Sequence, residues 1–491
     1  MDKQYLDKML LEMDKDLSKQ GMSRRDAMKL AGLSGAGILM GTTTASAEEE
    51  KIVKSDAKAK IVIVGGGLAG VSTAARLTLQ LSDPDITIIE PKKTSVSYQP
   101  GQTLVAAGIW EEEDIIYQRD DFIPDGVKVI EDRAVFFNPQ ENQLTTAKGQ
   151  VVTYDYLIIA MGVHLDFERI KGLEEAGRAM SAGNNDKLLD ALGDSICSIY
   201  TSAGSVKTWE IMQKYIEQAK SGSSDKKTQF VFTHPNTPLK CGGAPKKIVY
   251  LTNARLKEAG ARENAELTFY PNGGAMFGVP EYHDAIVGQF KREGIKHHYR
   301  HNLIEVDKEK KIATFDAKWQ EKGPWDPVMK DFEVIPKHEK LRVPYDFLHI
   351  APANIAPREI AESDLGSAKG WVPVNKETLQ HIRYMNVFSL GDVAQVPMGK
   401  TGGSVRKQYK VLVDNLIAHM NEKKMTAKYA GYTVCPLITD IGTVMLAEFD
   451  WTVKPTPSFP LDPTVERWVF WLMKVYALKP MTMYGMLSGR A

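Results

Sequence analysis

The chain has 491 residues, enough for two or three domains, and its composition of 43% hydrophobic and 25% charged residues is that of an ordinary globular protein. The chain has 62 basic residues (lysine and arginine) and 62 acidic residues (aspartate and glutamate), so its formal net charge is zero. This balance gives the protein no global positive field of the kind that would draw it to nucleic acid. Small neutral or apolar partners fit the composition better.

The first 47 residues resemble an export signal rather than part of the fold. Arg24 and Arg25 precede the apolar stretch 30–40, and residues 45–47 are small enough to suit a signal peptidase. The apolar stretch is too short to span a bilayer, and the paired arginines resemble a twin-arginine signal. The alternative is an amphipathic N-terminal helix of a cytoplasmic protein. We expect a periplasmic protein in which residues 48–58 form a solvated tether.

The elements of a dinucleotide-binding motif follow one another after the tether: a strand at 60–64, the loop glycines Gly65, Gly67 and Gly70, a helix at 68–79, a strand at 86–90 and the acid Glu90. Glycines let the backbone approach a pyrophosphate, whose charge is stabilised by the helix N-terminus. The acid would accept the ribose hydroxyls. An ordinary tight turn is the alternative, but strand, helix and acid in this order favour a dinucleotide site.

Two later segments indicate that the dinucleotide is FAD rather than NAD. The run 387–392 is a short apolar strand that ends in Asp392, whose carboxylate could hold the ribityl hydroxyls of a flavin. The predicted strand 151–160 ends at a glycine turn, Gly162. Each segment alone is also typical of an ordinary core strand, but in this order they resemble the disulfide-reductase-like flavoproteins. The resemblance implies bound FAD and an α/β fold with two Rossmann-like dinucleotide-binding domains.

The predicted elements divide the chain into a flavin domain that is interrupted by a second unit. We expect the first part of the FAD domain at 59–165, a second Rossmann-like domain at 166–350, the second part of the FAD domain at 351–420, and a C-terminal strand and amphipathic helix region at 421–491.

The connection between the predicted strand 228–233 and the predicted helix 246–259 departs from the pattern of an NAD site. Its sequence over 234–245 is HPNTPLKCGGAP, and the three prolines lack the N–H groups that a phosphate cradle requires. We therefore expect no nicotinamide site. Cys241 lies just before the helix, where the helix dipole and neighbouring lysines favour a reactive thiolate. The alternative for such a cysteine is a small buried hydrophobe.

Cys435 lies beside Pro436, ahead of the predicted strand 443–449. If Cys241 and Cys435 met at the flavin, they could cycle between disulfide and dithiol, which requires Cα atoms within about 7 Å. A structural disulfide is the alternative in an exported protein.

Several segments resemble the sulfide:quinone oxidoreductase family, in the branch that includes the mitochondrial enzymes: LKCGGAPKKI at 239–248, WVPVNKETLQ at 371–380, GYTVCP at 431–436 and LAEFD at 446–450. The likeness runs from about Ile61 to the C-terminus. It implies that Cys435 receives the sulfide sulfur as a persulfide and that Cys241 passes two electrons to the flavin, which reduces quinone. It also implies that Lys400 stabilises the reduced flavin, although a solvated lysine is the alternative.

Cys197 departs from the mitochondrial-type branch, although its surroundings resemble a third cysteine of other branches. Three interpretations stay open: it shuttles polysulfide, it is bonded to the flavin, or it is a buried bystander. The histidines His297, His298 and His301 lie in an arginine-rich stretch without a cluster of cysteines or acids. No metal site is therefore predicted.

The C-terminal tail carries an amphipathic pattern that indicates contact with a membrane surface. Trp468 and Trp471 begin an apolar stripe in the predicted helix 466–479, which Pro480 is expected to end. Two tryptophans with flanking cations favour an interfacial helix, while a core or dimer helix is the alternative. Tyr98 resembles a family residue near the flavin and is a candidate to line the quinone approach.

The sequence thus predicts a membrane-associated FAD enzyme that oxidises sulfide to sulfane sulfur or polysulfide and reduces quinone. An NADH:quinone oxidoreductase would share the fold but needs a second glycine loop. The flavin subunit of a flavocytochrome sulfide dehydrogenase would need a separate haem protein, because the chain has no Cys-x-x-Cys-His. The partners would be sulfide, a quinone and the membrane surface, and a homo-oligomer is left open.

Overall fold

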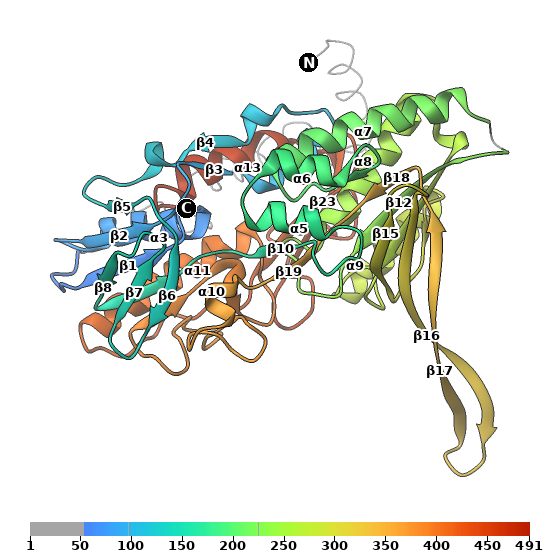
Figure 1. The fold of residues 1–491 in the computed structure, drawn as a ribbon. Helices are drawn as coiled ribbons and strands as arrows, with labels where there is room; N and C mark the ends of the chain where they lie inside the picture. Colours follow the sequence, from blue (N-terminus) through green and yellow to red (C-terminus); the bar gives the residue numbers. More distant parts are fainter. Residues whose placement is uncertain (1–53, 97, 224) are drawn as a thin grey trace. The chain divides into compact units, whose positions relative to one another are not determined.

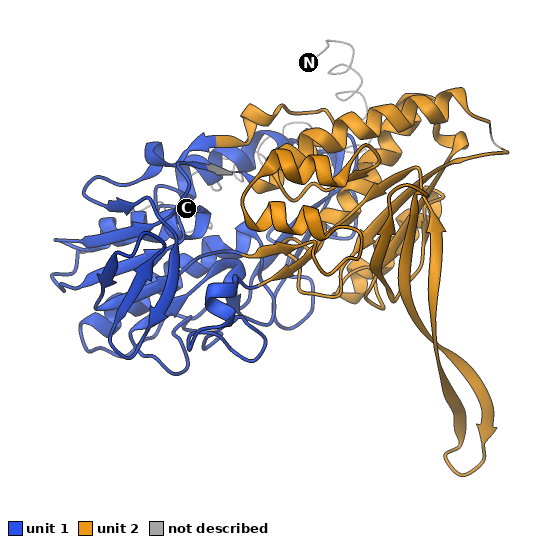
Figure 2. Cartoon of the chain, viewed as in Figure 1, with its two compact units in different colours: residues 1–98, 117–162, 356–491 blue, residues 99–116, 163–355 orange. Residues whose placement is uncertain are grey.

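The computed structural model describes residues 54–96, 98–223 and 225–491, and it divides the chain into two compact units (Figures 1 and 2). Unit 1 comprises the residues up to Tyr98, Tyr117–Gly162 and Ala356–Ala491, and unit 2 comprises Gln99–Ile116 and Val163–Ile355. Residues 99–116, which lie inside the expected first flavin segment, therefore belong to unit 2. The predicted export signal lies outside the described residues.

Unit 1 is built on a parallel sheet whose strands are, in spatial order, β21 (Val387–Ser389), β9 (Tyr156–Ile159), β1 (Lys60–Val64), β2 (Asp85–Ile89) and β5 (Lys128–Ile130). Ile61 and Ile63 are fully buried, because a parallel sheet covered on both faces needs continuous apolar strands. Helix α3 (Leu68–Gln80) joins β1 to β2 and packs against α11 (Gly402–Met420). This arrangement confirms the predicted dinucleotide-binding fold.

The strand expected at 151–160 is in fact two strands. β8 (Val151–Thr153) pairs antiparallel with β7 (Gln143–Thr146), which in turn pairs with β6 (Ala134–Asn138), whereas β9 joins the central sheet. Asp155 stands between them, and its carboxylate accepts a hydrogen bond of 2.7 Å from the N–H of Lys60. That bond ties the turn between the two strands to the start of β1.

Unit 2 contains a second parallel sheet, with strands in the order β11 (Ile196–Cys197), β18 (Phe347–His349), β12 (Thr228–His234), β13 (Ala265–Pro271) and β14 (Lys296–His297). Its main helices are α7 (Ser202–Ser221), α8 (Ala244–Glu258) and α9 (Pro280–Arg292). Helices α7 and α8 contact β12. This sheet confirms the second Rossmann-like domain.

The smaller elements of unit 1 include β3 (Thr94–Val96), α10 (Arg358–Ala361), β20 (Val372–Pro373), β22 (Ala394–Gln395), β23 (Thr433–Asp440) and β24 (Thr443–Phe449). Those of unit 2 include α4 (Gln102–Val105), β10 (His164–Asp166), α5 (Glu174–Ser181), α6 (Asn185–Leu192) and β19 (Ala353–Ile355). Strand β4 (Ile116–Gln118) lies where the chain passes from unit 2 to unit 1.

A long hairpin that the sequence pattern did not predict extends from unit 2 (Figure 2). β16 (Ile312–Asp326) lies between β15 (His301–Asp307) and β17 (Asp331–Pro344), but β15 pairs with β16 only as far as Ala317. Beyond that residue β16 and β17 pair only with each other. We call residues 318–338 the arm.

The C-terminal tail is helical from Trp468 to Met486 and continues through Pro480, so the prediction that Pro480 ends the helix is wrong. The segments are α12 (Trp468–Leu472), η6 (Met473–Ala477), α13 (Leu478–Pro480) and η7 (Met481–Met486), of which η6 and η7 are π-helical. A proline clashes with the carbonyl four residues earlier in an α-helix, and wider π-helical turns relieve that clash. None of the described helices has both the length and the apolar character needed to cross a bilayer.

Candidate functional site

The loop glycines between β1 and α3 have different structural roles. Gly65 has φ +111°, and a Cβ on it would lie 2.4 Å from the carbonyl oxygen of Ala160. A Cβ on Gly70 would lie 1.8 Å from the carbonyl oxygen of Gly65. A Cβ on Gly67, the N-cap of α3, would meet no atom within 4 Å, and no side chain caps this helix. Gly65 and Gly70 therefore allow the tight turn, while Gly67 leaves the helix N-terminus accessible to a phosphate.

Glu90 follows β2, and its carboxylate faces the glycine loop. It accepts hydrogen bonds from the N–H of Gly66 at 2.9 Å and from that of Lys92 at 3.1 Å. The fully buried Arg119 donates to the carbonyl oxygen of Glu90 at 3.3 Å, and a Cβ on Gly66 would lie 3.0 Å from Arg119 Cδ. Sequence reasoning missed Arg119, because an isolated arginine in a polar stretch gives no signal of burial.

The carboxyl ends of β1, β9 and β21 lie at one edge of the sheet in unit 1. Gly162 follows β9 with φ +69°, and Asp392 follows β21. A Cβ on Gly391 would lie 3.3 Å from Cβ of Ala69, so the end of β21 reaches the first turn of α3. The edge of a parallel sheet beyond its carboxyl ends is where such folds bind dinucleotides.

Lys400 extends this group of residues. Its ammonium donates to the carbonyl oxygen of Asp392 and, at 3.3 Å, to that of Ala394, and it lies 4.0 Å from the centre of the Trp371 ring. Burial lowers the pKa of Lys400 to about 8. A bound group with negative charge beside Lys400 would favour the ammonium form.

These residues fit FAD. The accessible N-terminus of α3 suits a pyrophosphate, and Glu90 supplies an acceptor for ribose. Asp392 adds a second carboxylate at the end of β21, and Lys400 adds a cation that contacts the same loop. All of them belong to unit 1.

Cys435 lies on β23, is 3% exposed, and belongs to the same unit. Its neighbours contact the first turn of α11: a Cβ on Gly403 would lie 2.1 Å from Cγ1 of Val434. The hydroxyl of Ser404 donates to that of Thr433 at 3.4 Å. Cys435 is thus held next to α11, which begins two residues after Lys400.

Cys241 lies in unit 2, in the loop between β12 and α8. Its φ of +54° is in the left-handed region, where a residue with a Cβ is strained. The ammonium of Lys247 lies 3.4 Å from its sulfur, and that of Lys246 donates to the carbonyl oxygen of Gly242 at 2.8 Å. The lysine and the N-terminus of α8 both stabilise negative charge on the sulfur. The pairing of Cys241 with Cys435 stays a prediction.

Cys197 is 1% exposed on β11, with its sulfur 3.8 Å from the carbonyl oxygen of Leu348. Burial raises the pKa of the Cys197 thiol far above its ordinary value. Such a thiol is a poor nucleophile at neutral pH, which favours the bystander among its three interpretations. Within the described residues, no three histidines, cysteines or acids are grouped as metal ligands would be.

Tyr98 and the tail contact each other within unit 1. Tyr98 is 2% exposed, burial raises its pKa, and the ammonium of the buried Lys474 lies 5.2 Å from the centre of its ring. Trp471 is also buried, whereas Trp468 is partly exposed. The predicted stripe of tryptophans therefore faces partly into unit 1.

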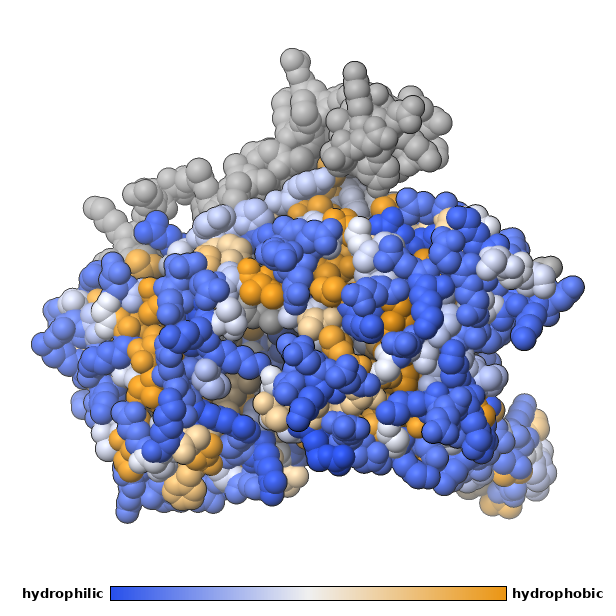
Figure 3. All heavy atoms as spheres, turned by 45° about the horizontal axis from the view of Figure 1, so that its top comes forward, coloured by the Kyte–Doolittle hydropathy of each residue, from blue (hydrophilic) through white to orange (hydrophobic). Residues whose placement is uncertain are grey.

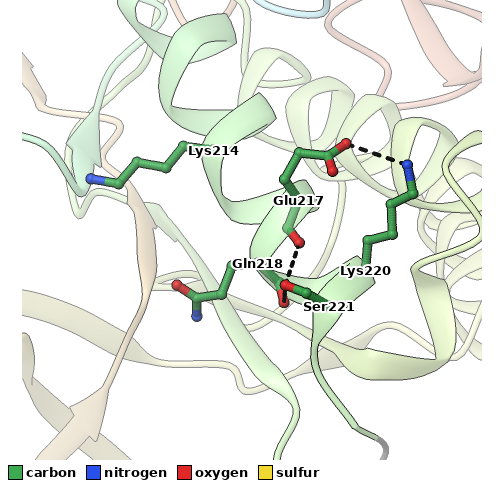
Figure 4. Close-up of a pocket in the computed structure, with 5 residues that line it drawn as sticks. All are labelled: Lys214, Glu217, Gln218, Lys220 and Ser221. Carbon is green, nitrogen blue, oxygen red and sulfur yellow. Dashed lines mark hydrogen bonds and ion pairs between the residues drawn. The ribbon is translucent and has the colours of Figure 1, made fainter.

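A pocket on α7 contains none of the predicted site residues (Figure 4). The lining residues are Lys214, Glu217, Gln218, Lys220 and Ser221. Glu217 forms an ion pair of 3.7 Å with Lys220 and accepts a hydrogen bond of 2.9 Å at its carbonyl oxygen from Ser221. These contacts lie within one helix, so the pocket gives no reason to place chemistry there.

Residues 59–195 match the family model described as pyridine nucleotide-disulphide oxidoreductase. The chain is 36% identical to the mitochondrial sulfide:quinone oxidoreductase of Mus musculus, over 88% of this chain and 86% of that protein. It is 34% identical to the mitochondrial sulfide:quinone oxidoreductase of Dictyostelium discoideum, over 92% of this chain and 91% of that protein. The structure of the Aquifex aeolicus sulfide:quinone oxidoreductase matches with a TM-score of 0.68 and 19% identity, covering 88% of this chain and 92% of that one, which supports the fold.

The comparison corrects the expected location. The mouse and Dictyostelium relatives are mitochondrial proteins, which points to a mitochondrial rather than a periplasmic location. The prediction of a periplasmic protein is therefore wrong. That prediction depended on residues 1–47, which resemble a signal for export to the periplasm but lie outside the described residues.

Proposed function

Since the chain belongs to the sulfide:quinone oxidoreductase family and is an FAD-dependent oxidoreductase, we propose that it oxidises sulfide to sulfane sulfur and transfers two electrons to a quinone. The observation that supports this most strongly lies in unit 1. There the glycine loop, Asp392 and Lys400 lie around the starts of α3 and α11, and α11 contacts the strand that carries Cys435.

In the proposed reaction, hydrosulfide attacks Cys435 while it is in a disulfide with Cys241. The new sulfur–sulfur bond makes a persulfide on Cys435, the old bond breaks, and its electron pair leaves on Cys241 as a thiolate. When bound, FAD supplies a two-electron acceptor that a quinone can reoxidise.

The surroundings of Cys241 suit it to be the leaving group. Lys247 and the N-terminus of α8 both stabilise the negative charge that its sulfur gains when the disulfide breaks. The left-handed backbone of Cys241 holds the sulfur at the start of this helix. A stabilised leaving thiolate speeds exchange, so little further acid-base catalysis is needed.

Lys400 is proposed to hold positive charge at the cofactor. The two carbonyl oxygens that it contacts orient its ammonium, and the Trp371 ring covers it. A cation fixed in this way stabilises an electron-rich ring system more than a mobile one in water does.

We propose that unit 1, which contains most of the segments 59–165 and 351–420 expected to form the FAD domain, is the FAD unit, and that unit 2 supplies Cys241 rather than a nicotinamide site. The loop from β12 to α8 contains Pro235 and Pro238, which cannot donate to a phosphate. This composition disfavours the NADH:quinone oxidoreductase.

The tail, 421–491, is proposed to contact the bilayer where the quinone dissolves. Because Trp471 is buried, this contact would use the exposed rings of Tyr476 and Tyr484, which are 56% and 76% exposed. Tyrosine is enriched at the level of the lipid headgroups, since its ring is apolar and its hydroxyl is polar.

The test is to mix the oxidised, FAD-loaded protein anaerobically with sulfide or with NADH and to follow flavin absorbance. We expect bleaching by sulfide only, and recovery of absorbance when a short-chain ubiquinone is added. Bleaching by NADH but not by sulfide would support the NADH:quinone oxidoreductase. Bleaching by sulfide without recovery, together with a co-purifying cytochrome, would support a flavocytochrome subunit.

A further inference from the structure

The distal part of the arm exposes large apolar side chains, which Figure 3 shows at the lower right. Trp325, Val328, Met329 and Phe332 are 52%, 86%, 75% and 38% exposed. Trp325 and Phe332 stack edge to face with ring centres 5.0 Å apart, across the two strands. A two-stranded ribbon has no core of its own, so burying these side chains requires something outside it.

The stem of the arm has the opposite character. Apart from Val334 and Ile335, its exposed side chains are mostly charged or polar, with cross-strand pairs such as Lys337 and Glu321 at 3.3 Å. Pro336 interrupts its edge. Lysines and prolines on a strand edge prevent another strand from pairing with it. The irregular pairing between Lys322 and Trp325 separates the stem from the end of the arm.

Aspartate carboxylates at the end of the arm accept hydrogen bonds from nearby backbone N–H groups. The carboxylate of Asp326 accepts hydrogen bonds from the N–H groups of Val328 at 2.7 Å and Met329 at 3.1 Å. That of Asp331 accepts one from the N–H of Phe332 at 2.7 Å. Moving a turn out of water costs less when its N–H groups already have partners.

The reach of this end matches a shallow insertion. About two or three residues separate the facing pair Trp325 and Phe332 from the tip of the turn. At about 3.3 Å per residue, the end of the arm is therefore roughly 7–10 Å long. Interfacial segments bury their apolar side chains about 5–10 Å into the boundary between headgroups and acyl chains. Lys330, at the turn, has a long side chain whose ammonium can extend back to the lipid phosphates.

Two further observations favour a bilayer over a second copy of the chain. A stable protein interface needs about 20–30 residues from each side, whereas the arm offers four exposed large apolar side chains at its end and a mostly charged or polar stem. The arm contains four lysines and four acids, so its formal net charge is zero. The end of the arm, 325–332, carries Asp326, Asp331 and Lys330, so it has no positive net charge that would need an anionic lipid, and a zwitterionic lipid suits it.

We propose that the end of the arm is a membrane-contact site that inserts into the headgroup region of a phosphatidylcholine bilayer, independently of the C-terminal tail. The arm belongs to unit 2, so this contact would hold the unit that carries Cys241 at the membrane.

The test is flotation of the full, FAD-loaded chain with phosphatidylcholine vesicles. The double variant Val328→Asp/Met329→Asp is expected to lower the vesicle-bound to free ratio about tenfold, because it places two charges in the inserted turn. The matched control Val151→Asp, at a valine that is 57% exposed in unit 1, is expected to bind like the unaltered chain. Brominated phosphatidylcholine should quench tryptophan fluorescence less in Trp325→Phe.

The proposal would be overturned if the double variant floated with vesicles as well as the unaltered arm does. This comparison is made with an intact tail and again in chains that also carry Tyr476→Asp/Tyr484→Asp. Unchanged flotation with loss of a dimer in sedimentation would also overturn the proposal, because the occupant would then be a second copy. Flotation does not depend on turnover, so a failure of the proposed sulfide chemistry would not change these outcomes.

Discussion

The two units place different loops and residues at the same position of the same supersecondary unit. After β1 the three residues 65–67 lead into α3, and after β12 the nine residues 235–243 lead into α8. The short loop leaves the helix N-terminus accessible at Gly67, whereas the long one carries Cys241 there, beside Lys247. The same helix dipole can thus stabilise a phosphate or a thiolate, and the residues of the loop decide which.

Removal of either sulfur should have the largest effect. Cys241→Ser and Cys435→Ser are each expected to lower sulfide-dependent quinone reduction by at least about 10³-fold, because neither disulfide nor persulfide can form. FAD content, measured by absorbance, should stay unchanged in both. Cys197→Ala is the control and should retain activity, because that thiol is buried on β11. Turnover by both serine variants would rule out the dithiol mechanism.

Substitution of a glycine tests whether only the loop of unit 1 is a phosphate cradle. Gly67→Val should lower FAD affinity at least about tenfold, because its side chain would occupy the space at the N-terminus of α3. FAD titration monitored by fluorescence measures the effect. Gly242→Val is the matched control, since a Cβ there also meets no atom within 4 Å, and FAD affinity should not change. Equal losses in both variants would contradict the assignment.

Substitution of Lys247 tests whether the loop of unit 2 stabilises a thiolate. Lys247→Gln should slow the bleaching of the flavin by sulfide about tenfold in stopped flow, because the leaving sulfur of Cys241 loses its cation. Lys240→Gln is the neighbouring control, as its ammonium lies over the Tyr200 ring. Its rate should stay within about twofold of the unaltered protein. A larger effect of Lys240→Gln would remove the special role of Lys247.

The smallest expected effect concerns Lys400. Its pKa falls from 10.5 to about 8 on folding, so the unfolded chain binds more protons between these values. The contribution of Lys400 to the free energy of unfolding of the apoprotein should therefore rise as the pH increases from about 8 to 10.5. Urea titrations across this pH range measure the free energy of unfolding. Its rise with pH should be smaller in Lys400→Met than in the unaltered apoprotein. An unchanged slope would mean that Lys400 is solvated.

The parts predicted from sequence are those whose signal is local. The boundaries of β1 and the start of α3 follow from an apolar run and a glycine loop, and Glu90 from its place at the end of the next run. Arg119 could not be predicted, since its burial depends on carbonyl groups far away in the chain. The arm was missed because its strands contain charges and prolines and have no apolar alternation.

Unit 1 is assembled from segments that are distant in the chain, and this has a consequence for folding during synthesis. β21 completes the central sheet by pairing with β9, and Ser389 donates to the carbonyl oxygen of Ile159 across 230 residues. Until the ribosome has made β21, the edge of β9 stays unpaired and open to aggregation. Such a high contact order slows folding, so cofactor uptake must wait until most of the polypeptide has been translated.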